Sequence, residues 1–237
     1  MGQEFEDLDL RGAEFWAVDL RGARFCDVDL SGARIERSRL TDVEIDAEID
    51  RIVINGVDVT DHVNANDPWY PLRTLIRPDG PDGLVEGWKL LEEEWNTTIG
   101  EATALPPELI RESVNGEWSF LQTLRHLVFA IDKWFFVPIL GAATFESIGL
   151  PNTGSIHSPW PGLDLEADPT LDEVLAVRAE QHRRFAETLA GLTPAHLEGE
   201  IDVPENGTMP RSEGYSVPLE EGFQHLRYAR RDLAQLS

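Results

Sequence analysis

Glu221 and His225 are the residues of this chain whose types and spacing are best suited to binding a metal ion. They lie four positions apart in the segment LEEGFQHLRYARRDLAQL, whose apolar residues recur at helical spacing, so both side chains project from one face of a helix. A carboxylate oxygen and an imidazole nitrogen on one face can hold a divalent ion together. His126, at the centre of the apolar segment SFLQTLRHLVFAIDKWFF, is the third candidate. A ligand from a second helix would leave coordination positions open to water or substrate.

Both patterns also occur without a metal. A buried histidine is common as a hydrogen-bonded core residue, and a Glu/His pair at this spacing is common as a surface pair. Three further residues are candidates for an extra ligand or for contacts that orient the ligands. Tyr228 and Asp232 continue the line of the pair along its helix, and His182 lies on the apolar stripe of an earlier helical segment.

Four segments with helical periodicity follow residue 80 and would carry these side chains. The last is expected to start at about residue 218, because Pro218 restricts where a helix can begin. Two long connections, 141–169 and 191–216, are rich in Gly and Pro, and connections of that length are often functional. Metal sites in helical bundles form from side chains on facing helices, so the pattern favours a four-helix bundle. The first predicted helix starts at Pro81 and carries an apolar stripe of Leu84, Trp88, Leu91, Trp95 and Ile99, and the second spans about 117–138. The third starts at a capping box of Thr170 and Glu173 and continues through Leu189, and the last runs from about 218 to the end.

The segments WSFLQTLRHLVFAIDKW and HLRYARRDLAQL resemble the DinB-like family, and the resemblance covers about residues 80–237. It implies a helical bundle in which three histidines bind a divalent metal, commonly zinc or nickel. His126 matches the first of these histidines and His225 the last, whereas Glu221 stands at the intermediate position. A carboxylate is still a competent oxygen ligand.

The same resemblance implies a class of chemistry. Similar proteins include thiol S-transferases and a mycothiol-dependent maleylpyruvate isomerase, in which the metal helps to generate a thiolate. The expected protein is therefore a metal-dependent enzyme with a small-molecule substrate and a low-molecular-weight thiol cosubstrate, since the only cysteine, Cys26, lies in the N-terminal segment. The alternatives are a metal-dependent hydrolase, in which Glu221 or Asp232 assists a bound water, and a catalytically inactive binding protein.

The N-terminal segment has a period of five residues, which fits neither a helix nor a strand. The repeats, such as DLRGA and DLSGA, resemble the pentapeptide-repeat family, which implies a right-handed square β-helix of about two coils over residues 4–48. The next segment, IDRIVINGVDVTDHV, predicts a capping hairpin around Asn-Gly. The large residues expected inside the β-helix are Phe5, Leu10, Phe15, Leu20, Phe25, Leu30, Ile35, Leu40 and Ile45.

Together these patterns predict an α+β multidomain protein. A short pentapeptide-repeat β-helix with its capping hairpin occupies residues 1–63, a linker residues 64–80, and an all-α DinB-like four-helix bundle residues 81–237. The repeat segment is expected to serve in docking or in forming a homo-oligomer.

Composition limits the partners. A formal net charge of −24 repels phosphate backbones and argues against nucleic-acid binding. No apolar run approaches the roughly 20 residues that cross a bilayer, so no membrane association is expected. The start, MGQEFEDLDL, lacks the basic and apolar regions of a secretory signal, and a single cysteine allows no intrachain disulfide. Both features favour the cytoplasm.

Overall fold

The computed structural model describes residues 5, 8–26 and 28–236, and the chain forms two compact units, Met1–Asp46 and Ala47–Ser237. Parts of the predicted repeats (Glu4, Glu6, Asp7 and Asp27) and the predicted end of the last helix at Ser237 lie outside the described residues. In the described part of the chain, no helix combines the length and the apolar character that a bilayer crossing requires.

The first unit is organised by β-turns that recur every ten residues. The Ala13 N–H donates to the Leu10 carbonyl at 2.9 Å, and the same bond recurs ten and twenty residues later. Gly12, at the third turn position, has a φ of +76°, a conformation that glycine adopts without a steric cost. Asp9, the residue before the turn, accepts a hydrogen bond from the Arg11 N–H through Oδ1 at 3.1 Å, which stabilises the turn. The backbone therefore repeats once for every two pentapeptides.

The structure does not show the β-helix expected for this unit. None of its described residues lies in a strand, and the apolar series expected inside it is exposed: Phe15 to 65% and Leu20 to 50%. The physical reason is the small number of coils. Repeat folds need about three stacked units to enclose a continuous core, whereas this segment has enough residues for about two coils of four repeats.

The second unit begins with the hairpin that the Asn-Gly pair predicts. Strands β1 (Val53–Ile54) and β2 (Val57–Asp58) pair antiparallel. Asn55 and Gly56 have φ values of +51° and +82°. Positive φ at both central residues is typical of a type I′ turn.

The segment predicted as a linker packs onto the bundle instead. Helix α1 (Thr60–Asn66) runs into it and the 3-10 helix η1 (Leu72–Leu75) lies within it. Leu72 and Ile76 are buried in the main core, because a spacing of four residues places both on one side of a helical turn. An ion pair of 2.7 Å between Arg73 and Asp67, both largely buried, fixes the turn between the two helices.

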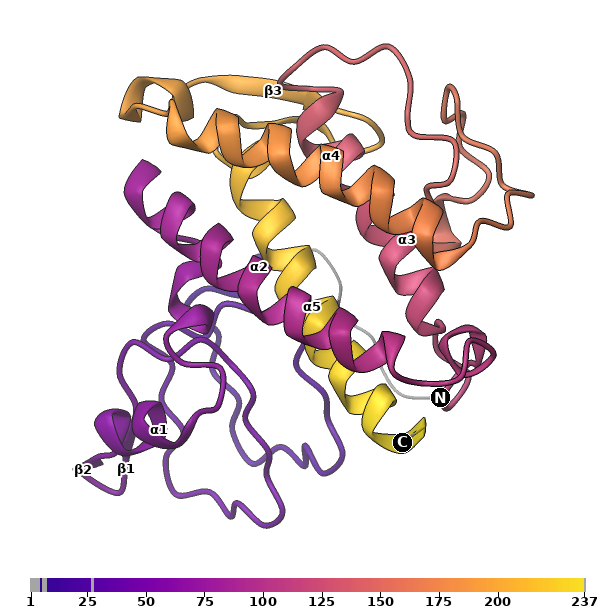
Figure 1. The fold of residues 1–237 in the computed structure, drawn as a ribbon. Helices are drawn as coiled ribbons and strands as arrows, with labels where there is room; N and C mark the ends of the chain where they lie inside the picture. Colours follow the sequence, from indigo (N-terminus) through magenta and orange to yellow (C-terminus); the bar gives the residue numbers. More distant parts are fainter. Residues whose placement is uncertain (1–4, 6–7, 27, 237) are drawn as a thin grey trace. The chain divides into compact units, whose positions relative to one another are not determined.

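Helices α2, α3, α4 and α5 form the bundle (Figure 1). Helix α2 contacts α5, α5 contacts α3, α3 contacts α4, and α4 contacts α2, so each helix has two neighbours. Capping boxes at Ser119 and Thr170 satisfy the first N–H groups of α3 and α4. The capping box at Thr170 is the one that the sequence predicts. The bounds are α2 Pro81–Thr103, α3 Phe120–Ile131, α4 Leu171–Ala190 and α5 Glu213–Leu236.

The connections differ from the predicted loops in two places. A hairpin of β3 (Glu200–Val203) and β4 (Gly207–Pro210) occupies the second connection. Helix α5 then begins at Glu213 and contains Pro218, so the predicted start at 218 is wrong. Proline removes one intrahelical hydrogen bond, and the burial of neighbouring residues such as Tyr215 and Leu219 offsets that loss. Shorter 3-10 helices lie at η2 Leu109–Arg111, η4 Thr153–Ser155 and η5 Pro194–Leu197.

Gly87 allows α2 to approach the segment before it. A Cβ at this position would lie 2.5 Å from the Leu75 carbonyl oxygen, whereas a Cβ at Gly100, in the same helix, would meet nothing within 4 Å. We expect Gly87→Ala to lower the free energy of unfolding by about 1–3 kcal/mol. Gly100→Ala should raise it by about 0.5–1 kcal/mol, because alanine favours the helix. Urea denaturation of both variants tests this, and equal effects would contradict the close approach.

Helix α3 continues into a π-helical turn, η3 (Asp132–Phe136), which the sequence does not indicate. The Asp132 carboxylate inside this turn accepts from the Glu146 N–H at 2.7 Å and from Gln181 Nε2 at 2.8 Å. It therefore connects α3 to α4 and to the following loop. Burial is the main cause that raises the pKa of Asp132 from 3.8 to about 7.

This raised pKa predicts a pH dependence of stability. Between pH 4 and 7 the folded state keeps a proton on Asp132 that the unfolded state has released, so the free energy of unfolding falls by up to about 1.4 kcal/mol per pH unit from this group. Asp132→Asn loses one acceptor at a cost that does not change with pH. The free energy of unfolding of Asp132→Asn minus that of wild type should therefore rise from pH 4 to 7 and stay constant above pH 7. Urea denaturation at several pH values measures this difference. A constant difference would show that Asp132 ionises normally.

Candidate metal centre

His126, Glu221 and His225 lie together between α3 and α5. His126 comes from the middle of α3, and the other two lie one turn apart on α5. His126 Nε2 is 3.5 Å and His225 Nε2 is 3.3 Å from Glu221 Oε2. The two imidazole ring centroids are 4.8 Å apart. The structure thus brings together the three residues that the sequence suggests as ligands.

A backbone contact sets the orientation of His126. Its Nδ1 lies 3.0 Å from the Leu150 carbonyl oxygen. Because a carbonyl only accepts, Nδ1 carries the proton in this contact and the neutral ring presents the lone pair of Nε2 toward Glu221. The Leu150 N–H in turn donates to the Arg125 carbonyl at 3.1 Å. The long loop after α3 is therefore fastened to the helix beside the ligand.

The tautomer has an electrostatic consequence. A lone pair on His126 Nε2 facing a carboxylate oxygen at 3.5 Å is repulsive unless a proton or a cation lies between the two atoms. Burial raises the pKa of Glu221, but when His126 and His225 are protonated and donate to its carboxylate, their hydrogen bonds and charges outweigh burial and lower that pKa to about 2. Glu221 is therefore ionised at neutral pH, and its position between two imidazoles suits a positive species.

Trp118 covers one side of the cluster. Its ring centroid lies 4.6 Å from that of His126 and 6.0 Å from that of His225, with which it is stacked. The side chains of His225 and Glu221 are 17% and 32% exposed, compared with 7% for His126. The cluster therefore has a buried side at α3 and an accessible side at α5.

The two distances from Glu221 fit one ion shared with either histidine. For ligand bonds of about 2.1 Å, two ligand atoms of a tetrahedral site lie about 3.4 Å apart. The two Glu–His distances, 3.5 and 3.3 Å, match that separation, and one ligand atom from each residue lies within 4.8 Å of the others. Among the residues that the structure describes, this is the group that could hold a metal ion in this way.

The three additional candidates lie outside this cluster. The Tyr228 ring packs against His225 at 6.0 Å but is 43% exposed. Asp232 is held by Arg231, whose Nε lies 2.7 Å from its Oδ1. The Nδ1 of His182 lies 2.6 Å from Glu92 Oε1, so His182 has a different carboxylate as its partner. Tyr228 is thus beside a ligand, whereas Asp232 and His182 have other partners.

Comparison with known families agrees with this architecture. The model of the DinB superfamily matches residues 90–229, a span that includes all three clustered residues. The chain belongs to the DinB superfamily. The pentapeptide-repeat model matches residues 4–43 in eight copies. No curated protein and no solved structure matches the chain significantly.

In this DinB protein, sequence reasoning missed the Leu150 carbonyl and Trp118 as parts of the site. Trp118 directly precedes the Ser119 cap of α3, and an aromatic residue at that position was a usable signal for a contact with the first turns of the helix. Leu150 contributes only a backbone oxygen, for which the sequence carries no signal. Glu92, the partner of His182, was also missed, although it lies on the first of the predicted helices.

Proposed function

We propose that this DinB protein is a divalent-metal-dependent enzyme that uses a low-molecular-weight thiol to act on a small-molecule substrate, as a transferase or isomerase. The observation that carries the proposal is the cluster of His126, Glu221 and His225, whose ligand atoms lie within 4.8 Å of one another. Membership in a superfamily that is often metal-binding supports it.

The donor set fits zinc or nickel. Imidazole nitrogen suits both metals, and two histidines with one carboxylate form a donor set known from catalytic zinc sites, which keep a position open. His126 would be held in its ligating orientation by the Leu150 carbonyl, as the second ring nitrogen of a metal-binding histidine usually is. Glu221 would contribute the negative charge.

The chain's own groups define what a substrate would meet. A bound divalent metal would lower the pKa of a thiol and thereby supply a thiolate near neutral pH. Trp118 shields the two imidazoles on one face, while the partly exposed Glu221 leaves an approach from the α5 side. The only cysteine, Cys26, is exposed in the first unit. We therefore assign the reacting thiol to a cosubstrate.

Thiol consumption tests the proposal. We expect protein reconstituted with zinc or nickel to accelerate the loss of a small thiol in the presence of an electrophile such as 1-chloro-2,4-dinitrobenzene. Metal-free protein and His225→Ala should show only the uncatalysed rate, because neither would hold the ion. Metal-dependent ester hydrolysis without thiol would instead identify a hydrolase. Stoichiometric metal with neither activity would identify a catalytically inactive binding protein.

A further inference from the structure

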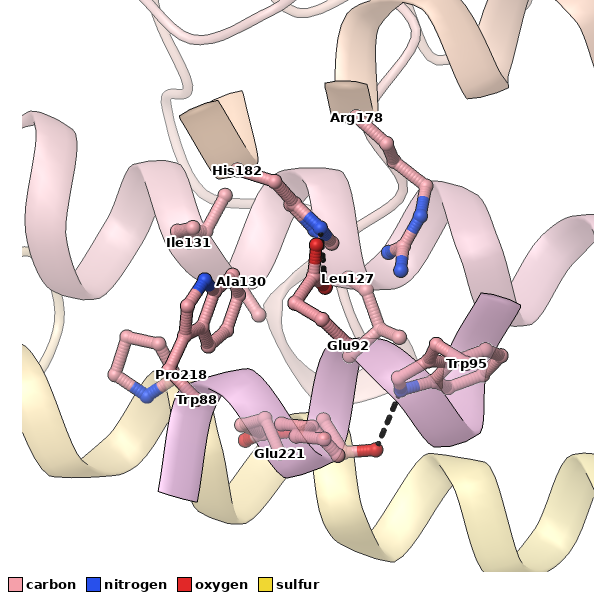
Figure 2. A pocket seen from close by; sticks show the side chains of 12 residues that line it. Trp88, Glu92, Trp95, Leu127, Ala130, Ile131, Arg178, His182, Pro218 and Glu221 are labelled. Atoms are coloured by element: carbon pink, nitrogen blue, oxygen red, sulfur yellow. Dashed lines mark hydrogen bonds and ion pairs between the residues drawn. The ribbon is translucent and has the colours of Figure 1, made fainter. Parts of the chain in front are cut away.

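A second polar group lies inside the bundle, in a cavity between all four helices (Figure 2). Arg178 and His182 extend from α4 toward Glu92 of α2, and the surrounding wall is apolar and aromatic. The cavity also reaches Glu221, so it adjoins the candidate metal centre. Its lining includes Trp88, Trp95, Leu127, Arg178, His182 and Glu221.

Arg178 has an unused donor in this cavity. The residue is only 4% exposed, and its Nη1 has no hydrogen-bond partner among the described residues. Glu92 is engaged by His182, whose Nδ1 lies 2.6 Å from Glu92 Oε1. Figure 2 shows the guanidinium directed into the space between Glu92 and Trp95. A buried donor without a partner costs about 1–3 kcal/mol, which a stable core would ordinarily avoid.

The surroundings keep Arg178 charged and in place. Burial lowers the pKa of Arg178 to about 10, against the opposing effect of Glu92, so the guanidinium remains protonated at neutral pH. Its Cζ lies 5.2 Å from the Trp95 ring centroid, which favours a cation over the ring face. Trp95 is itself fixed, because its Nε1 donates to the Gly222 carbonyl at 3.0 Å. A fixed, charged donor that points into a cavity can hold an anion, here against the repulsion of the Glu92 and Glu221 carboxylates in the same lining.

We propose that this cavity binds the carboxylate group of a small ligand through Arg178 Nη1. If the proposed function holds, that ligand is the substrate, and its carboxylate enters the cavity that Glu221 and Arg178 both line. The cavity volume of about 20 Å³ exceeds the roughly 10–15 Å³ that one ordered water needs. The site is therefore small, and formate is the appropriate probe.

Thermal unfolding with formate tests the site in metal-free protein, at constant ionic strength and with formamide as the neutral control. We expect formate at ten times its dissociation constant to raise the Tm by about 3–6 °C, and formamide to have no effect. Arg178→Met should abolish the shift. Without formate its Tm should equal or exceed that of wild type, because the buried charge is removed.

NMR of wild-type protein keeps the test informative if that variant does not fold. Formate should shift the indole N–H signals of Trp88 and Trp95, which line the cavity, and leave that of Trp16, an exposed residue of the first unit, unchanged. Signals assigned by Trp→Phe substitution identify each residue. A shift of Trp16 alone would overturn the proposal.

Other outcomes also decide the matter. No difference between formate and formamide would mean that the cavity holds only water, and an equal Tm shift in Arg178→Met would place formate elsewhere. Either result overturns the proposal. A Tm shift with formate that requires added metal and is lost in His225→Ala would mean that formate binds the metal. That result would contradict the Arg178 site but not the proposed function. If formate shifts the Tm of wild type but not of Arg178→Met, and the protein binds no metal at all, the Arg178 site is supported and the proposed metal-dependent function is contradicted.

Discussion

His225→Ala is expected to abolish stoichiometric metal binding while the bundle stays folded. The substitution removes one of three ligands, so the loss of affinity should exceed the 10–100-fold typical of residues that only orient a ligand. The side chain is partly exposed on α5, and alanine favours a helix, so the cost in stability should be small. Inductively coupled plasma mass spectrometry after dialysis against zinc or nickel measures the metal content directly.

A thermal readout and a matched control complete this test. Zinc at 100 times its dissociation constant should stabilise wild type by about 2.7 kcal/mol, which corresponds to a rise in Tm of about 5–10 °C. His225→Ala should show no rise. His62→Ala removes an exposed histidine of α1 and should behave as wild type. Equal metal content in wild type and His225→Ala would show that the cluster is not the binding site.

Phe185→Ala is expected to have the largest effect on stability. Phe185 is fully buried, and its ring lies 4.6 Å from that of Trp88 and 4.7 Å from that of Phe135. Removing a buried phenylalanine costs about 3–5 kcal/mol, because apolar burial is lost and a cavity remains. Urea denaturation followed by circular dichroism of the helices measures the loss.

Phe25→Ala is the matched substitution in the first unit. Phe25 is 62% exposed, and exposed substitutions usually change stability by no more than about 0.5 kcal/mol. Calorimetry, which registers both units, should therefore show an unchanged transition for Phe25→Ala and a lower Tm for Phe185→Ala. A large loss of stability in Phe25→Ala would instead support the β-helix interior that the repeat pattern predicts.

The bundle could be predicted because its signals are local. Leu84, Trp88, Leu91 and Trp95 recur at helical spacing and all become buried in α2, and the capping box at Thr170 starts α4 as predicted. The start of α5 could not be read from Pro218, because the preference of proline is weaker than the packing of the residues around it. Tertiary contacts of this kind are not visible in the sequence.

The candidate site was also predictable only in part. Residue type and spacing suggested His126, Glu221 and His225, because imidazole and carboxylate are the donors a metal needs. The sequence did not indicate what orients them, since the Leu150 carbonyl belongs to an irregular loop whose path depends on the whole fold. The partly buried Glu92–His182 pair could not be predicted either, because its partners come from α2 and α4 and no local spacing relates them.

The ten-residue period of the turns sets the step by which the first unit could change in length. Gly12, Gly22 and Gly32 occupy the left-handed position of successive turns, whereas the intermediate pentapeptides place Ala17 and Arg37 at positive φ five residues later. Adding or removing a single pentapeptide would bring together two unlike corners and replace the glycine that occupies this position at residues 12, 22 and 32, although Asp42 holds the same position with a φ of +54°. A change of ten residues would keep every corner in phase. The pentapeptide is thus the repeat of the sequence, and the decapeptide is the module in which the chain can be extended or shortened.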